Sequence, residues 1–172
     1  YKRQLREIIE GTAIAKDFTH IYASSFYYNE HGEPCWPAQV INYTNKTQFL
    51  FRIEKGILDI NDNAVNDHFA EGELRVPFRN IVYIGDSATD IPCMRLVNSL
   101  GGHSVGVYDL ENTDSKDTVR RMIRDERIRY YVPAAYTKGS EMDTLMHRII
   151  DKTAAYEVLE EKHLRDRKEA VD

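Results

Sequence analysis

Hydrophobic residues along the first half of the chain follow two different periods. Apolar residues recur three and four positions apart over residues 2–16 and 44–55, which predicts two amphipathic helices. Between these helices, two stretches that carry aromatic and β-branched residues, 20–29 and 35–42, flank a short turn and predict a β-hairpin. The polar and acidic stretch 59–79 predicts a surface excursion that contains one short helix.

The second half of the chain begins with an apolar run. Residues 80–84 (NIVYI) end at a Gly-Asp pair and predict a strand that is buried on both faces of a parallel sheet. Further strands are expected at 103–109 and 129–134, and the expected helices occupy residues 91–100, 114–126 and 140–163. Strands that alternate with helices are typical of βαβ units, so the predicted fold class is α/β with a parallel sheet and a β-hairpin.

The composition is that of one ordinary globular domain. The 172 residues are enough to bury a core without disulfides, and Cys35 and Cys93 are the only cysteines. A net charge of −5 argues against a nucleic-acid partner, and no apolar run reaches the roughly 18–20 residues of a membrane helix. The N-terminus also lacks the apolar core of a signal peptide. We therefore expect a cytoplasmic protein with no nucleic-acid or membrane partner, built as one domain over 1–163 with a charged tail that frays over 164–172.

Two aspartates lie close together after the apolar run. Asp86 follows Gly85 at the expected end of the strand, which is where ligands bind in open α/β sheets. Asp90 lies four residues later, at the start of the next expected helix. Carboxylates are hard oxygen donors that suit Mg²⁺, with water and phosphate at its remaining positions. A purely structural alternative is that Asp86 occupies a turn and Asp90 caps the helix.

The segment from Gly85 to Asp90 (GDSATD), placed after an apolar strand, resembles the fourth motif of haloacid-dehalogenase-like (HAD) hydrolases. The chain resembles the phosphoserine-phosphatase-like branch of that family, most strongly over residues 37–58 and 79–108. The resemblance implies a three-layer, Rossmann-like core in which Asp86 and Asp90 hold Mg²⁺.

Two positions of this motif differ from the branch that it resembles. Ser87 and Thr89 stand where phosphoserine phosphatases usually carry Gly and Asn. The resemblance therefore implies a phosphatase for a small phosphorylated metabolite, and not for phosphoserine in particular.

A lysine near the start of the helix predicted at 44–55 matches another motif of the family. HAD enzymes carry a third-motif lysine in the first turn of such a helix, and Lys46 occupies that place. The resemblance implies that its ammonium stabilises negative charge on the phosphoryl group, an attraction that grows in a partly desolvated site. Lys55 is the competing candidate, but its position in the last helical turn suits the helix dipole.

The chain lacks the first two motifs of the family. No D-x-D sequence occurs in it, so it has no D-x-D-x-[TV] nucleophile, and it begins at Tyr1, just beyond the place of the second motif. The resemblance implies the C-terminal part of a phosphatase that works through an aspartyl phosphate, inactive alone, with its nucleophile outside this chain. The missing first strand would leave sheet edges for an N-terminal segment or a homo-oligomer to cover. The alternative is a non-catalytic α/β binding or scaffolding module derived from a phosphatase.

Overall fold

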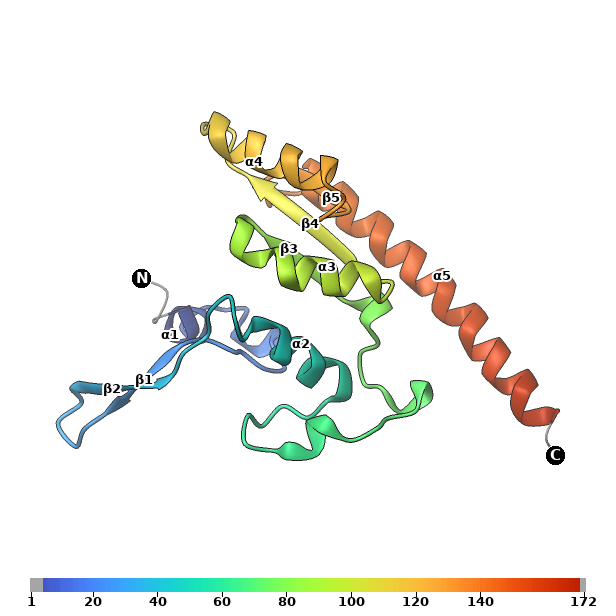
Figure 1. Ribbon diagram of the computed structural model, residues 1–172, viewed down its shortest axis with the longest axis horizontal. Coiled ribbons are helices and arrows are strands. Elements are labelled where there is room, and N and C mark those ends of the chain that lie inside the picture. The colour runs from blue at the N-terminus through green and yellow to red at the C-terminus, as the bar shows by residue number, and fades with distance from the viewer. Residues whose placement is uncertain (1–4, 171–172) are drawn as a thin grey trace. The chain divides into compact units, whose positions relative to one another are not determined.

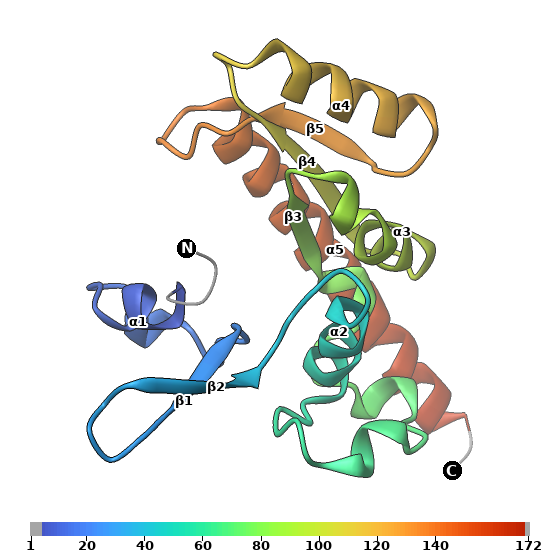
Figure 2. The same ribbon diagram turned by 60° about the vertical axis from the view of Figure 1, so that its left-hand side comes forward.

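The computed structural model describes residues 5–170, and the chain divides into two compact units, Tyr1–Arg75 and Val76–Asp172. The first unit contains a two-stranded antiparallel sheet, and the second contains a three-stranded parallel sheet (Figures 1 and 2). The predicted fold class, α/β with a parallel sheet and a hairpin, is confirmed.

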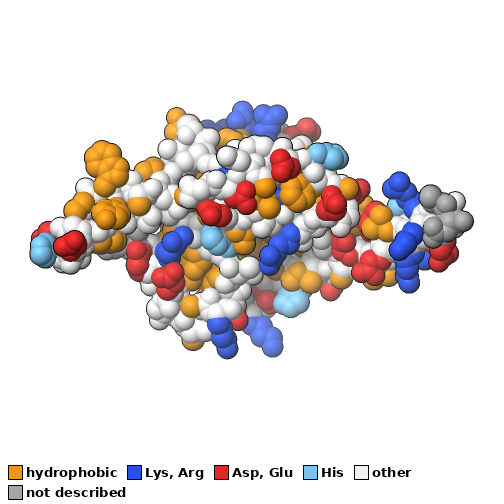
Figure 3. All heavy atoms as spheres, turned by 90° about the horizontal axis from the view of Figure 1, so that it is seen from below, with side chains coloured by type: hydrophobic (Ala, Val, Ile, Leu, Met, Phe, Trp, Pro, Cys, Tyr) orange, Lys and Arg blue, Asp and Glu red, His pale blue; other side chains and the backbone are white. Residues whose placement is uncertain are grey.

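In the first unit, the predicted hairpin is confirmed. Strands β1 (Ser25–Tyr28) and β2 (Pro34–Gln39) pair antiparallel, with Tyr27 opposite Trp36. Both of these aromatic side chains are exposed, and the hairpin carries large hydrophobic groups on the surface at the left of Figure 3. A two-stranded sheet has no further strands with which to bury them.

Helix α2 (Lys46–Lys55) is the helix predicted at 44–55. It buries Phe49 and Leu50, two of the apolar residues on which the prediction depends. It ends at Gly56, whose φ of 74° is a left-handed conformation that glycine adopts without a steric penalty.

Helix α1 (Leu5–Glu10) is much shorter than the helix predicted at 2–16. After Gly11 the chain forms only a 3₁₀ turn at Ala15–Asp17, and residues 2–4 lie outside the described part. No residue of α1 is buried. Short helices are only marginally stable without tertiary packing, so the described residues of α1 lack the buried contacts that would stabilise a helix of the predicted length.

The prediction of a single short helix within 59–79 is also wrong. The structure has three separate 3₁₀ turns there, Asn63–Asn66, Glu71–Glu73 and Phe78–Asn80. The reason, for residues 57–62, is a set of hydrogen bonds to one side chain of α2. The guanidinium of Arg52, which is 5% exposed, donates to the backbone carbonyls of Ile57, Asp59, Ile60 and Asp62. These carbonyls find their donors on a side chain of α2, so the segment wraps around Arg52 and does not form a helical ladder.

In the second unit, parallel strands alternate with helices. The strands are β3 (Val82–Gly85), β4 (His103–Tyr108) and β5 (Tyr130–Pro133), and they lie side by side in that order. The helices are α3 (Ile91–Ser99) between β3 and β4, α4 (Thr113–Arg124) between β4 and β5, and α5 (Glu141–Glu169) after β5. Each strand and helix predicted for this half is present.

Side chains on the two faces of this sheet form two separate core clusters. Met94 of α3 and Val119 of α4 pack with Tyr108 on one face, and Met142 and Ile149 of α5 belong to the cluster on the other face. Helices α3 and α4 therefore cover one face and α5 covers the other, so that this unit has three layers (Figure 2).

Strand β3 is not buried on both faces as expected. Among residues 5–170 it pairs with β4 alone, and it forms one edge of the sheet. Ile84 is 43% exposed, whereas all six residues of β4 are buried. The expectation is wrong because burial of a strand requires neighbours on both sides, and an apolar run does not report how many neighbours the strand has.

Helix α5 is longer than the helix predicted at 140–163. It starts after Ser140, whose hydroxyl accepts a hydrogen bond from the Asp143 N–H, and it continues to Glu169. The charged segment that we expected to fray is therefore helical as far as Glu169, and an ion pair one turn apart between Lys162 and Asp166 favours that conformation. Despite its length, α5 is too polar to cross a membrane, and no other helix within 5–170 is long and apolar enough to do so.

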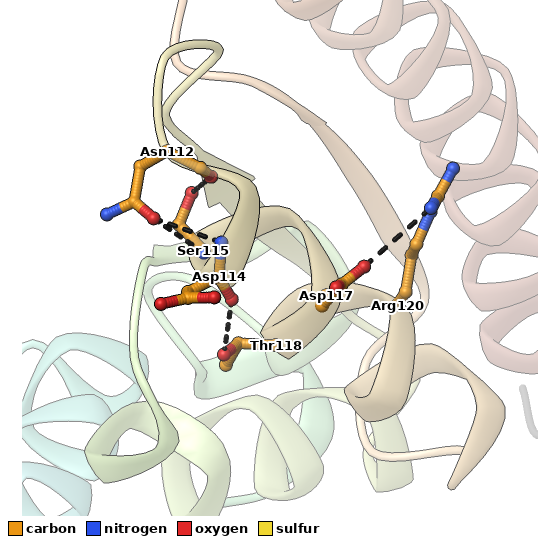
Figure 4. A network of polar contacts seen from close by, with 6 residues as sticks. All are labelled: Asn112, Asp114, Ser115, Asp117, Thr118 and Arg120. Carbon is orange, nitrogen blue, oxygen red and sulfur yellow. Dashed lines mark hydrogen bonds and ion pairs between the residues drawn. The ribbon is translucent and has the colours of Figure 1, made fainter.

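Local side-chain bonds fix the start of α4 (Figure 4). The side-chain oxygen of Asn112 accepts hydrogen bonds from the N–H groups of Asp114 and Ser115, as is typical of a helix N-cap. The hydroxyl of Ser115 in turn accepts from the N–H of Asp109, the residue that follows β4. These bonds hold the connection between β4 and α4 at the carboxyl edge of the sheet.

Candidate functional site

The two predicted metal ligands lie on one short loop at the carboxyl end of β3. Asp86 follows the last strand residue and is exposed, and Asp90 lies in a single 3₁₀ turn that leads directly into α3. Asp90 is only 6% exposed. The loop therefore presents one carboxylate to solvent and holds a second one beneath the surface.

The carboxylate of Asp90 is held by two hydroxyl groups. The Tyr83 hydroxyl donates to Oδ1 at 2.8 Å, and the Ser87 hydroxyl donates to Oδ2 at 3.1 Å. Asp90 precedes α3, but its side chain makes no capping hydrogen bond to that helix. The structural alternative in which the Asp90 side chain caps the helix is therefore wrong, and its carboxylate is oriented by β3 and by its own loop.

Gly85 permits the close approach of this carboxylate to the strand. A Cβ atom at Gly85 would lie 2.8 Å from the Asp90 Cβ, 2.9 Å from the Asp90 Cγ and 2.8 Å from the Met94 Cε. Non-bonded carbon atoms do not approach so closely, so the arrangement requires glycine at this position. The motif residue Gly85 thus shapes the space in which Asp90 lies.

The oxygen donors of this loop fit Mg²⁺. This ion is commonly held by one or two carboxylates, with water and substrate phosphate at the other positions. Within residues 5–170 no group of three or more His, Cys, Asp or Glu side chains is placed to hold a metal ion. Asp86 and Asp90 alone would therefore leave most of the coordination sphere to other ligands.

Tyr83 and Ser87 are site residues that the sequence analysis missed. Burial raises the pKa of the Tyr83 phenol, and its hydrogen bond with Asp90 raises that pKa further, so Tyr83 stays protonated and remains a donor at neutral pH. The signal for Tyr83 is the two-residue period of a strand, which puts Tyr83 and Gly85 on the same face, towards α3. Ser87 lies within the motif, and its hydrogen bond to Asp90 identifies it as a site residue.

The predicted catalytic lysine belongs to the first unit. Lys46 is the first residue of α2, directly after the N-cap Asn45, and is half-buried. The competing Lys55 has a structural contact, because its Nζ donates to the carbonyls of Val65 at 2.8 Å and Asp67 at 2.7 Å. The two carboxylates and Lys46 thus lie in different units, Asp86 and Asp90 on one loop of the second and Lys46 on a helix of the first.

The fold and the loop together define an α/β protein with an acidic loop at the carboxyl end of an edge strand. Neither a protein-family model nor a solved structure matches the chain. A curated relative, described as an uncharacterized protein of Borreliella burgdorferi, is 26% identical over 102 residues. The match covers 59% of this chain and 34% of the relative, so the chain spans about a third of the length of the relative that it matches.

Proposed function

We propose that the chain is the C-terminal part of a Mg²⁺-dependent phosphohydrolase of the HAD type, from its phosphoserine-phosphatase-like branch, acting on a small phosphorylated metabolite. The observation that carries the proposal is the GDSATD loop, with Asp86 exposed and Asp90 buried at the carboxyl end of a parallel strand. Parallel α/β sheets bind their ligands at this edge.

Each candidate residue has a distinct role in the proposal. Asp86 and Asp90 would hold Mg²⁺, which when bound polarises a phosphoryl oxygen and neutralises part of its charge. By the resemblance, Lys46 would supply positive charge to the phosphoryl group. The carboxylate nucleophile comes from residues outside this chain.

The exposed edge of β3 also supports the proposal. Val82–Gly85 has the apolar composition of a strand inside a parallel sheet, yet within the described residues it has one neighbour. An additional parallel strand on that edge would cover Ile84 and would end beside Asp86. A nucleophile carried by such a strand would lie at the acidic loop.

The test is to express this chain together with the reading frame upstream of Tyr1. We expect that frame to encode D-x-D-x-[TV] and the longer protein to hydrolyse p-nitrophenyl phosphate only when Mg²⁺ is present. Asp86→Asn should abolish the activity, and Asp117→Asn, at an exposed carboxylate on α4, should leave it unchanged. Activity retained in Asp86→Asn would refute the metal assignment. A frame without the nucleophile motif would favour the non-catalytic binding or scaffolding module.

A further inference from the structure

The hairpin of the first unit exposes two aromatic rings on one face. Tyr27 of β1 and Trp36 of β2 lie opposite each other in the antiparallel register, so their side chains leave the sheet on the same side. Tyr27 is 65% exposed and Trp36 is 73% exposed. Within residues 5–170 neither ring takes part in an aromatic or cation–π contact, so both rings are available to a ligand.

The charges around the two rings select a cationic partner. The sequence has no lysine or arginine over residues 17–45, whereas the turn of the hairpin carries Glu30 and Glu33, both exposed. The negative face of an aromatic ring attracts cations, and tryptophan attracts them most strongly. The rings and the carboxylates therefore favour the same sign of charge. A nucleic acid is disfavoured at this face, because no cationic side chain is present to neutralise its phosphates.

We propose that this face of the hairpin binds a basic peptide segment of another protein, whose arginine or lysine side chains stack on Tyr27 and Trp36 and lie near Glu30 and Glu33. A single exposed cation–π contact strengthens binding only about two- to fivefold, whereas millimolar affinity needs about a thousandfold gain over molar affinity. One cation is therefore too little, and a chain that links several cations is required. The inference is independent of the proposed function, because it needs neither Mg²⁺ nor a nucleophile.

The test uses the fluorescence of Trp36, the only tryptophan of the chain, which reports binding at this face directly. A synthetic peptide of alternating arginine and serine is added to the ¹⁵N-labelled 172-residue chain at low salt. We expect the Trp36 emission to change in a saturable way, and the amide signals that shift to lie within residues 25–39. Binding should weaken as the salt concentration rises. A peptide of alternating glutamate and serine should have no effect.

Two variants separate the rings from the carboxylates. Tyr27→Leu keeps an apolar side chain but removes one ring, and it should weaken peptide binding about two- to fivefold. Tyr136→Leu, at a tyrosine of the second unit that is 67% exposed, is the matched control and should bind the peptide as wild type does. Glu30→Gln/Glu33→Gln should weaken binding and flatten its salt dependence. Should Tyr27→Leu disturb the hairpin, as its amide spectrum without peptide would reveal, the glutamine variant decides alone.

Several results would overturn the proposal. These are an unchanged Trp36 emission, an equal response to the acidic peptide, and wild-type affinity in either hairpin variant. Acrylamide quenching of the longer protein that includes the frame upstream of Tyr1 gives another, because a shielded Trp36 would assign this face to the interior of that protein. Self-association of the chain through the hairpin without peptide would assign the face to a second copy instead. None of these results bears on the Mg²⁺ site, and failure of the phosphatase test would leave peptide binding unaffected.

Discussion

The substitution Gly85→Ala gives a direct test of how the acidic loop is built. The added methyl group would lie 2.8 Å from the Asp90 Cβ and 2.8 Å from the Met94 Cε. The Met94 methyl group ends a flexible side chain and can move. The Asp90 side chain is attached at the start of a helix and is held by two hydroxyl groups, so it cannot move without breaking those bonds.

The expected cost follows from these contacts. Overpacking in a well-packed interior costs about 1–3 kcal/mol, and loss of a hydrogen bond to a charged group costs about 1.5–3 kcal/mol. Replacing Gly by Ala also lowers the conformational entropy of the unfolded chain, which stabilises the folded state by about 0.4–1 kcal/mol. We therefore expect Gly85→Ala to lower the free energy of unfolding of the second unit by about 2–4 kcal/mol.

The neighbouring glycine on β4 provides a matched control. A Cβ at Gly106 would lie 2.7 Å from the Ile128 Cδ1, which ends a flexible side chain, and 3.2 Å from the Val119 Cγ1. Because no atom of the acidic loop is involved, Gly106→Ala should cost about 1 kcal/mol. Its amide signals for residues 86–90 should not change.

The measurement is urea unfolding, followed on resolved amide signals of the second unit. Gly85→Ala should unfold at clearly lower urea than Gly106→Ala and should shift the amide signals of the acidic loop. Equal stability of Gly85→Ala and wild type, with unchanged loop signals, would show that Asp90 does not lie against the strand.

Two further predictions concern stability. Arg52→Met removes the guanidinium donor from four backbone carbonyls, of which that of Asp59 keeps the Asp62 N–H, and should lower the free energy of unfolding of the first unit by about 3 kcal/mol or more, measured in urea. Thermolysin should then cut residues 57–62 faster, and an unchanged cleavage rate would contradict this role. Burial, together with the positive charges of Lys152 and Arg129, lowers the pKa of His103. The unfolded state therefore binds a proton at His103 more readily than the folded state does. The free energy of unfolding should fall as the pH drops below about 6.5, by up to about 1.4 kcal/mol per pH unit. His103→Phe should flatten that dependence in urea unfolding, and an identical pH dependence in the variant would exclude His103 as its source.

Local patterns in the sequence were sufficient for the elements whose structure is decided locally. The hairpin follows from its aromatic and β-branched stretches, and α2 follows from the spacing of Phe49, Leu50 and Ile53. The acidic loop follows from glycine and aspartate after an apolar run. In each case the residues that carry the signal also make the contacts that form the element.

The parts that the sequence did not predict depend on where individual side chains point and what they contact. The path of residues 57–62 is set by the buried guanidinium of Arg52, and no local pattern indicates where that side chain points. The hydrogen bond from Tyr83 to Asp90 joins a strand to the loop beyond it and depends on the packing of α3. Helix α5 continues beyond its predicted end because opposite charges four residues apart, such as Lys162 and Asp166, stabilise a helix, so a charge-rich end need not fray.

The position of β3 links the fold to the proposed chemistry. Edge strands are commonly protected by charged residues, proline or bulges, yet Val82–Gly85 contains neither a charged residue nor a proline, and Ile84 is 43% exposed. Asp86 follows this strand and faces solvent, and within residues 5–170 no group of three or more His, Cys, Asp or Glu side chains is placed to hold a metal ion. Under the proposed function, one additional parallel strand would pair with β3 and would bring its own carboxyl end to Asp86.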